Sequence, residues 1–116
     1  MFEGHDTTAT AIVYVLHILG CYPEVQEKVY AEIQTVGGAT EEVTFEHLGQ
    51  FKYLECVIKE TLRLCPSVPL FTRRLCEDDN IGGYVIPAGT QLIVNPFLIH
   101  RDPKHWPDPE MFRPER

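Results

Sequence analysis

The sequence predicts a mainly α protein with a small antiparallel β-sheet, and two observations support this fold class. Apolar residues recur at helical spacing before Pro66, whereas two short runs rich in β-branched residues, with glycine and proline around them, come only after it. The chain has 116 residues, of which 44% are hydrophobic. This size allows one domain at most, or part of one.

The first predicted helix covers residues 3 to about 20. Its apolar residues surround most of its circumference, which is typical of a helix buried in a larger body. A second helix is predicted from Pro23, a residue tolerated in a first turn, to about Thr35. Its apolar stripe consists of Val25, Val29 and Ile33, and the residues predicted to face water are Glu24, Glu27, Lys28 and Glu32.

Residues 37–39 (Gly-Gly-Ala) predict a loop, after which Thr44 and His47 resemble the cap of a short helix that ends at Leu48. No Glu is present to complete a capping box there. The next helix contains Glu60 and is expected to stop at Pro66. Its apolar stripe is formed by Tyr53, Leu54, Val57, Ile58, Thr61 and Leu62.

Two short strands are predicted at residues 81–86 and 90–94, on either side of a turn at residues 87–89 (Pro-Ala-Gly). A short helix near residues 97–101 follows, and the proline-rich remainder is expected to be loop. The chain contains no internal repeat and no low-complexity tract.

Composition excludes several classes of function. Lys plus Arg is 10 and Asp plus Glu is 17, so the net charge of 10 − 17 = −7 argues against a nucleic-acid partner. No apolar run is long enough to predict a bilayer span, and there is no signal-peptide pattern. The four cysteines show no metal-binding or paired spacing, and the histidines show no ligand spacing, so no metal ligand is predicted within the chain.

Glu60 and Arg63 lie three residues apart, so both side chains share one helical face and can form a charge-assisted pair. By spacing alone, most such pairs are solvated surface pairs. Near the start of the chain, Gly4 lies within a predicted helix, where glycine is less stable than other residues. Its presence there suggests a specific role, such as allowing a ligand to approach closely. Asp6 and Thr7 beside it offer an acid and an alcohol, although from the residues alone an ordinary acidic helix start is the favoured interpretation.

Taken in order, these segments carry a resemblance to a known family. They are residues 3–8 (EGHDTT), residues 60–63 (ETLR) with the exit at residues 66–69 (PSVP), the strand-like residues 84–90 (YVIPAGT), and residues 100–103 (HRDP) with 109–116 (PEMFRPER). The succession resembles the C-terminal half of a cytochrome P-450 monooxygenase over essentially the whole chain. The first motif further resembles family four, the fatty-acid omega-hydroxylase branch.

The resemblance implies roles for the first helix. Asp6 and Thr7 would lie over the haem iron and deliver protons during oxygen activation, and Gly4 would make room for the oxygen. In the family-four branch the residue matching Glu3 can be ester-linked to a haem methyl group. Esterification would remove the cost of desolvating a carboxylate, but an unlinked acid remains an equal alternative.

The resemblance also implies that Glu60 and Arg63 accept Arg116 as a third partner, forming a clamp that fixes the segment before the haem loop. Arg74 is expected to contact a haem propionate, with adjacent Arg73 as the alternative. Three apolar residues fit either a substrate pocket or an ordinary core: Val68, Leu70 and Phe71.

The activity implied for the parent enzyme is insertion of one oxygen atom from dioxygen into C–H bonds of apolar substrates such as fatty acids. The implied cofactor is haem b, whose iron binds a Cys in a Phe-x-x-Gly-x-Arg-x-Cys loop that none of the four cysteines matches.

We therefore expect residues 1–116 to be a partial domain without the N-terminal half and without the haem ligand, inactive alone. The implied partner is NADPH–cytochrome P-450 reductase, on the cytosolic face of the endoplasmic reticulum, with membrane association through an N-terminal anchor outside the chain. A noncatalytic helical fragment that binds partners rather than haem is the alternative.

Overall fold

The computed structural model describes the backbone of residues 2–37 and 43–116, and the side chains of these residues from Gly4 onward. Helix α1 (Phe2–Cys21) is followed by α2 (Pro23–Gly37), the short α3 (Phe45–Leu48) and α4 (Lys52–Leu64). The second half contains β1 (Phe71–Arg74), β2 (Asp79–Ile81), β3 (Tyr84–Ile86), β4 (Gln91–Val94) and the short α5 (Pro96–Ile99). The predicted class, mainly α with a small antiparallel sheet, is confirmed, although the strands form two separate ribbons.

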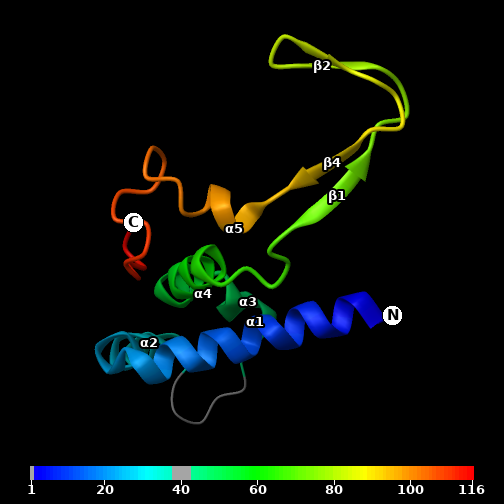
Figure 1. Cartoon of the computed structure of the whole chain (residues 1–116). Helices are drawn as coiled ribbons and strands as arrows, with labels where there is room; N and C mark the ends of the chain where they lie inside the picture. The colour runs from blue at the N-terminus through cyan, green and yellow to red at the C-terminus, as the bar shows by residue number, and fades with distance from the viewer. Residues whose placement is uncertain (1, 38–42) are drawn as a thin grey trace.

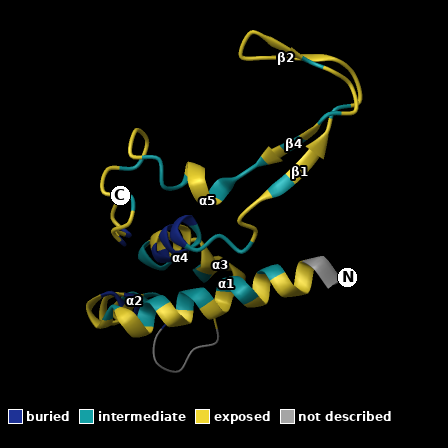
Figure 2. Ribbon diagram, in the orientation of Figure 1, coloured by how far each residue is buried: buried dark blue, intermediate teal, exposed yellow. Residues whose placement is uncertain are grey.

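The helices pack at one end of the molecule, and the two ribbons extend away from them (Figure 1). The radius of gyration is 18.6 Å, against about 13 Å for a compact domain of this length. Most of the two β-ribbons and much of α1 are exposed, while the buried residues gather on α4 and on the side of α2 that faces it (Figure 2). The described residues therefore form one small core from which an extended arm leads away.

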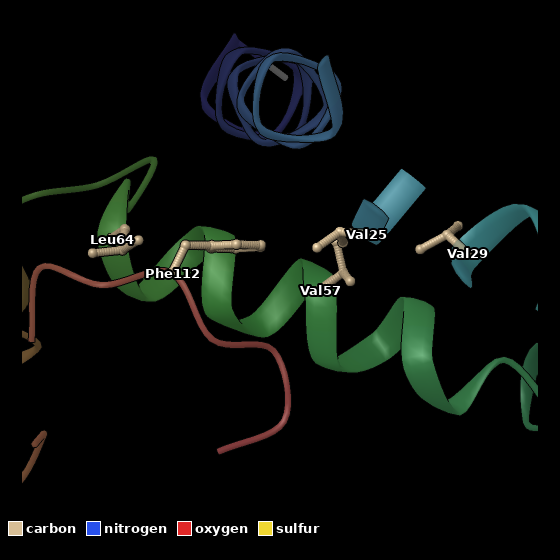
Figure 3. Close-up of a cluster of buried hydrophobic side chains, with 5 residues drawn as sticks. All are labelled: Val25, Val29, Val57, Leu64 and Phe112. Carbon is tan, nitrogen blue, oxygen red and sulfur yellow. The ribbon is translucent and has the colours of Figure 1, made fainter. Parts of the chain in front are cut away.

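That core is a cluster of five apolar side chains from α2, α4 and the C-terminal segment (Figure 3): Val25, Val29, Val57, Leu64 and Phe112. Val25 and Val29 confirm the predicted stripe of α2, with Ile33 packed beside them. Tyr22 packs against Phe112 with 4.9 Å between ring centroids and ring planes tilted by 36°, which brings the C-terminal segment onto the helices. Burial of this apolar surface is the main attraction between the two halves of the chain.

Two predictions about the helices need correction or qualification. The Glu32 side chain, expected to face water, is half-buried against the start of α4. On α1 the apolar residues Ile12, Val13 and Leu16 are 55–64% exposed, so their burial in a larger body stays a prediction. Of the predicted loop at residues 37–39, Gly37 is the last residue of α2, and the rest lies outside the described residues.

The prediction of two strands on either side of residues 87–89 is incomplete, and the first of the two is wrong as a single strand. Residues 81–86 do not form one strand, because Gly82 and Gly83 have positive φ angles of 62° and 89° and form a tight turn between β2 and β3. Two adjacent positive φ values suit the two-residue hairpin turn that glycine favours. Strand β4 pairs instead with β1, in the register Phe71↔Val94 to Arg74↔Gln91.

Short local contacts fix the remaining elements. His47 takes the place of the missing Glu at the start of α3, where the Thr44 N–H donates to its Nδ1 at 3.3 Å. Asn95 caps α5 by accepting the Leu98 N–H at 3.1 Å, and Pro96 occupies the first helical position. The short helix predicted near residues 97–101 is thus present, but it begins one residue earlier and ends two residues earlier, at Ile99.

Candidate functional site

The centre of the site is the carboxylate of Glu60 on α4, which is buried with 5% of the residue exposed. Arg63, one turn further along and 3% exposed, donates from Nε to Glu60 Oε2 at 2.8 Å and from Nη2 to Oε1 at 2.9 Å. Arg116 donates from Nε to the same Oε1 at 2.8 Å. One carboxylate thus holds two guanidiniums, and we call Glu60, Arg63 and Arg116 the clamp.

Arg63 uses all five of its N–H donors. Besides its two bonds to Glu60, Nη1 donates to the carbonyls of His100 and Pro109 at 2.8 and 2.7 Å, and Nη2 donates to Met111 at 3.1 Å. Its guanidinium carbon lies 5.2 Å from the centroid of the Trp106 ring. Because the segment after α5 has neither helix nor strand, these carbonyls need partners from elsewhere, and Arg63 supplies them.

Arg116 completes the same arrangement from the other side. Its guanidinium donates to the carbonyls of Pro107, Asp108 and Met111 at 2.5, 2.9 and 2.8 Å, and its side chain is 16% exposed. The Arg113 N–H donates to Glu60 Oε1 at 2.9 Å. The irregular C-terminal segment is therefore held in one path by side chains that act in place of secondary structure.

The hydrogen bonds decide the charge state of Glu60. Burial alone would raise the pKa of its carboxyl, but bonds from Arg63, the Arg113 N–H and Arg116 outweigh burial and lower the pKa below the usual 4.5. Glu60 is therefore ionised at neutral pH. A buried carboxylate satisfied in this way is stable only while its partners remain in place.

Two residues that the sequence did not single out position α4 itself. Glu32 on α2 accepts the Tyr53 N–H at 2.7 Å and the Leu54 N–H at 2.9 Å, so it caps the start of α4 from another helix. Arg101 donates from Nη2 to the Leu64 carbonyl at 2.7 Å, at the opposite end of the same helix. Only the HRDP motif at residues 100–103 gave a sequence signal for Arg101, and none was available for Glu32.

The polar residues predicted on α1 lie apart from the clamp, at the N-terminal end of that helix (Figure 1). Asp6 is 74% exposed, and its Oδ1 lies 3.5 Å from Nδ1 of adjacent His5. The hydroxyl of Thr8, next to Thr7, donates to the Gly4 carbonyl one turn back at 3.0 Å. The Glu3 side chain lies outside the described residues.

On β1 the two candidate arginines lie on opposite faces, because successive strand residues alternate. The Arg73 guanidinium carbon lies 5.0 Å from the Phe71 ring centroid, on the face that those two residues share. Arg74 lies over Gly89, where an added Cβ would be 3.5 Å from Nη2. Val68 and Leu70, before the strand, are 44% and 53% exposed.

The residues present fit a haem group at its periphery and not at its iron. Within the described residues neither Arg73 nor Arg74 forms an ion pair with a carboxylate, so either guanidinium can bind an anionic group. No three His, Cys, Asp or Glu side chains of the described chain are grouped to hold a metal ion. Three cysteines are exposed and Cys65 is half-buried, and none has the sequence around it that the iron ligand requires.

No single helix among the described residues is both long and apolar enough to cross a bilayer, although α1 and α2 pass that test as a pair bent by 112°.

Comparison with known proteins agrees with this arrangement. The chain matches the cytochrome P450 family over residues 1–116. It is 58% identical to cytochrome P450 4V2 of Mus musculus over 100% of its own length, and 50% identical to cytochrome P450 4c3 of Drosophila melanogaster over 99%. It spans 22% of the length of each of these relatives.

Among solved structures, a zebrafish cytochrome P450 with progesterone superposes with a TM-score of 0.93 at 33% identity, covering 97% of this chain and 27% of that one. The mainly helical fold and its small ribbons are thus those of a cytochrome P450, and family membership implies a haem cofactor. Both of these relatives carry family-four names. The chain belongs to the cytochrome P450 family and is a family-four-like part of such a protein.

Proposed function

We propose that the full-length protein containing these residues is a haem-thiolate monooxygenase that inserts one oxygen atom from dioxygen into C–H bonds of apolar substrates such as fatty acids. The clamp carries this proposal, since Glu60, Arg63 and Arg116 form a fully hydrogen-bonded unit in a chain that belongs to the cytochrome P450 family throughout. Haem supplies the oxidation when bound, and the protein supplies position and protons.

The clamp would act by position. Arg63 and Arg116 together bind the carbonyls of residues 100, 107, 108, 109 and 111. These bonds fix the position and direction of the backbone at Arg116. A loop that presents a cysteine thiolate needs such a fixed entry, because small displacements of a positioned group are costly in rate.

Proton supply is assigned to Asp6 and Thr7 on α1, whose exposed N-terminal turns are open to further parts of the protein. Gly4 would admit oxygen beside them. An added Cβ at Gly4 would meet nothing within 4 Å, so any close approach at Gly4 is made by a group outside the described residues. The ester link of Glu3 to haem belongs to the same proposal.

On β1, Arg73 or Arg74 would bind a haem propionate. If Phe71 lines the substrate pocket with Val68 and Leu70, the shared face of Phe71 and Arg73 supports Arg73, whereas the position of Arg74 after the Pro66 exit matches the propionate-binding arginine of the family. Family-four relatives support NADPH–cytochrome P-450 reductase as the electron donor, and the cytosolic face of the endoplasmic reticulum membrane as the location.

The carbon-monoxide difference spectrum of the reduced full-length protein tests the function. We expect a thiolate-type Soret band in the wild type and its loss in Glu60→Ala, which leaves Arg63 and Arg116 without their carboxylate. An unchanged band in that variant would contradict the role of the clamp. Residues 1–116 alone with haem should give no such band, because no cysteine among them fits the iron; a band there would show that this chain provides the thiolate.

A noncatalytic fragment that binds other proteins is the other outcome. It would be indicated by a transcript with a stop codon directly after codon 116, together with the absence of any haem spectrum.

A further inference from the structure

A second set of contacts lies on the outer surface beside the clamp and joins α2, α4 and the C-terminal segment. Lys28 on α2 donates to Glu115 Oε1 at 2.9 Å, and the Tyr53 hydroxyl on α4 donates to the same oxygen at 3.2 Å. Lys28 Nζ also lies 5.4 Å from the centroid of the Tyr53 ring. We call Lys28, Tyr53 and Glu115 the outer bridge.

Tyr53 is the residue through which these contacts meet. Its backbone N–H donates to Glu32, its ring lies under the Lys28 ammonium, and its hydroxyl reaches Glu115. Lys28 and Glu32 are four residues apart on α2, so they share one helical face. That face therefore holds both the start of α4 and the end of the chain.

Glu115 and Arg116 are adjacent, yet they are held in different places. Arg116 reaches inward to Glu60 on α4, while Glu115 reaches outward to Lys28 on α2. One anchor fixes the position of a segment, but a second anchor on the neighbouring residue also fixes its rotation. Because Arg116 is already ordered, holding Glu115 costs little beyond the entropy of its own side chain.

We propose that the outer bridge positions the C-terminal segment for the haem loop, with Lys28 and Glu115 acting as positioning residues. The role toward the haem loop rests on the proposed function. The contacts of the outer bridge do not, because they join residues that the structure describes. Consistent with the geometry, the bond to Lys28 lowers the pKa of Glu115, and the bond to Glu115 raises the pKa of Lys28.

Solvent exposure makes the outer bridge sensitive to salt. Both the Lys28 and Glu115 side chains are 57% exposed. At 1 M salt the screening length in water is about 3 Å, so dissolved ions weaken the attraction between these two charges. The inner anchor, the Glu60–Arg116 pair, has side chains that are only 5% and 16% exposed, so salt screens it much less. The two anchors can therefore be separated by ionic strength.

The test uses full-length protein and the variant Lys28→Met, with Lys59→Met as the matched control. Lys59 also forms an exposed pair, with Glu55 at 2.6 Å and side chains 72% and 52% exposed, but that pair lies entirely within α4. At low salt we expect amide hydrogen exchange within residues 112–116, at every residue except Pro114, to rise about two- to five-fold in Lys28→Met and Glu115→Gln. The same exchange should stay unchanged in Lys59→Met. High salt should raise wild-type exchange toward the Lys28→Met level.

Two further measurements separate positioning from simple stability. Lys28→Arg keeps the charge and should restore wild-type exchange, and the Lys28→Met, Glu115→Gln double variant should change no more than either single variant. In the haem protein, Lys28→Met should lower the thiolate-type fraction of the carbon-monoxide complex while the haem content stays constant.

Equal exchange at residues 112–116 in Lys28→Met and Lys59→Met would overturn the outer bridge. An unchanged carbon-monoxide spectrum with raised exchange would overturn its role toward the haem loop. If the wild-type protein gave no thiolate band at all, the proposed function would be contradicted. The hydrogen-exchange test of the outer bridge would still be valid, because it does not depend on that function.

Discussion

The Nε atom of Arg116 lies 2.8 Å from Oε1 of Glu60, although 56 residues separate them in sequence. That oxygen also accepts hydrogen bonds from Arg63 Nη2 and from the Arg113 N–H. A single carboxylate oxygen therefore connects one helical turn of α4 to two points on the C-terminal segment. The charge at Glu60 therefore links the path of that segment to α4.

Replacing Glu60 with Gln should destabilise the protein strongly. The change keeps the size of the side chain but leaves two guanidiniums without their counter-charge, and breaking a buried ion pair costs about 3–5 kcal/mol. Urea unfolding of full-length protein measures this loss. The control is Glu55→Gln, whose 52% exposed carboxylate pairs with Lys59 on the same helix and should cost less than about 1 kcal/mol. Equal losses in the two variants would contradict a special role for burial.

The stability contributed by Glu60 should depend on pH in the acid range. Its pKa in the folded protein is below 4.5, so folding disfavours its protonation. The contribution is complete above pH 4.5 and is lost as the pH falls through the lower, folded pKa. The gap in unfolding free energy between wild type and Glu60→Gln should therefore narrow only below pH 4.5. Other carboxylates with lowered pKa, such as Glu55 and Glu115, cancel in this difference. A gap that narrows already near neutral pH would mean that the pKa of Glu60 is raised.

Periodicity in the sequence was enough to predict α1, α2 and α4, because each carries an apolar pattern long enough to be distinguished from chance. The stripe of α4 is clear, with Val57 and Thr61 fully buried. The pairing of the strands was not predictable in the same way. Phe71 to Arg74 ends in two adjacent charges and shows no alternation, so nothing local marks it as a strand, and its partner β4 comes only after an intervening hairpin.

The candidate site shows the same division. Spacing placed Glu60 and Arg63 on one face, and the family resemblance added Arg116, but burial of the pair is a property of the packed chain. Glu32 is the clearest example of what the sequence cannot give. Its position on α2 is on the polar face by periodicity, and only the packing of α2 against α4 brings it to the Tyr53 and Leu54 N–H groups.

Removing the Glu32 carboxylate should loosen the start of α4. In Glu32→Ala two helix N–H donors lose their acceptor, and loss of such a cap costs about 0.5–2 kcal/mol. The effect should appear as faster amide exchange at Tyr53 and Leu54, with less change near Thr61 at the middle of the buried stripe. Glu27→Ala, an exposed carboxylate on the same helix, is the matched control. Equal exchange at Tyr53 in the two variants would show that Glu32 does not act as a cap.

The alternation of β1 allows Arg73 and Arg74 to be told apart. A planar group bound at one face of the strand is reached by one of these side chains and not by the other. Alanine at the propionate-binding position removes a charge-assisted bond, typically about 1.5–3 kcal/mol, which corresponds to roughly 10- to 150-fold faster haem loss. Transfer of haem from full-length protein to an excess of apomyoglobin measures the rate for Arg73→Ala and Arg74→Ala. Faster loss in Arg74→Ala alone supports the residue predicted first, and faster loss in Arg73→Ala alone supports the face shared with Phe71. Equal rates in both variants and the wild type would mean that neither arginine binds a propionate. Because the two side chains lie on opposite faces of one strand, neither could take the place of the other.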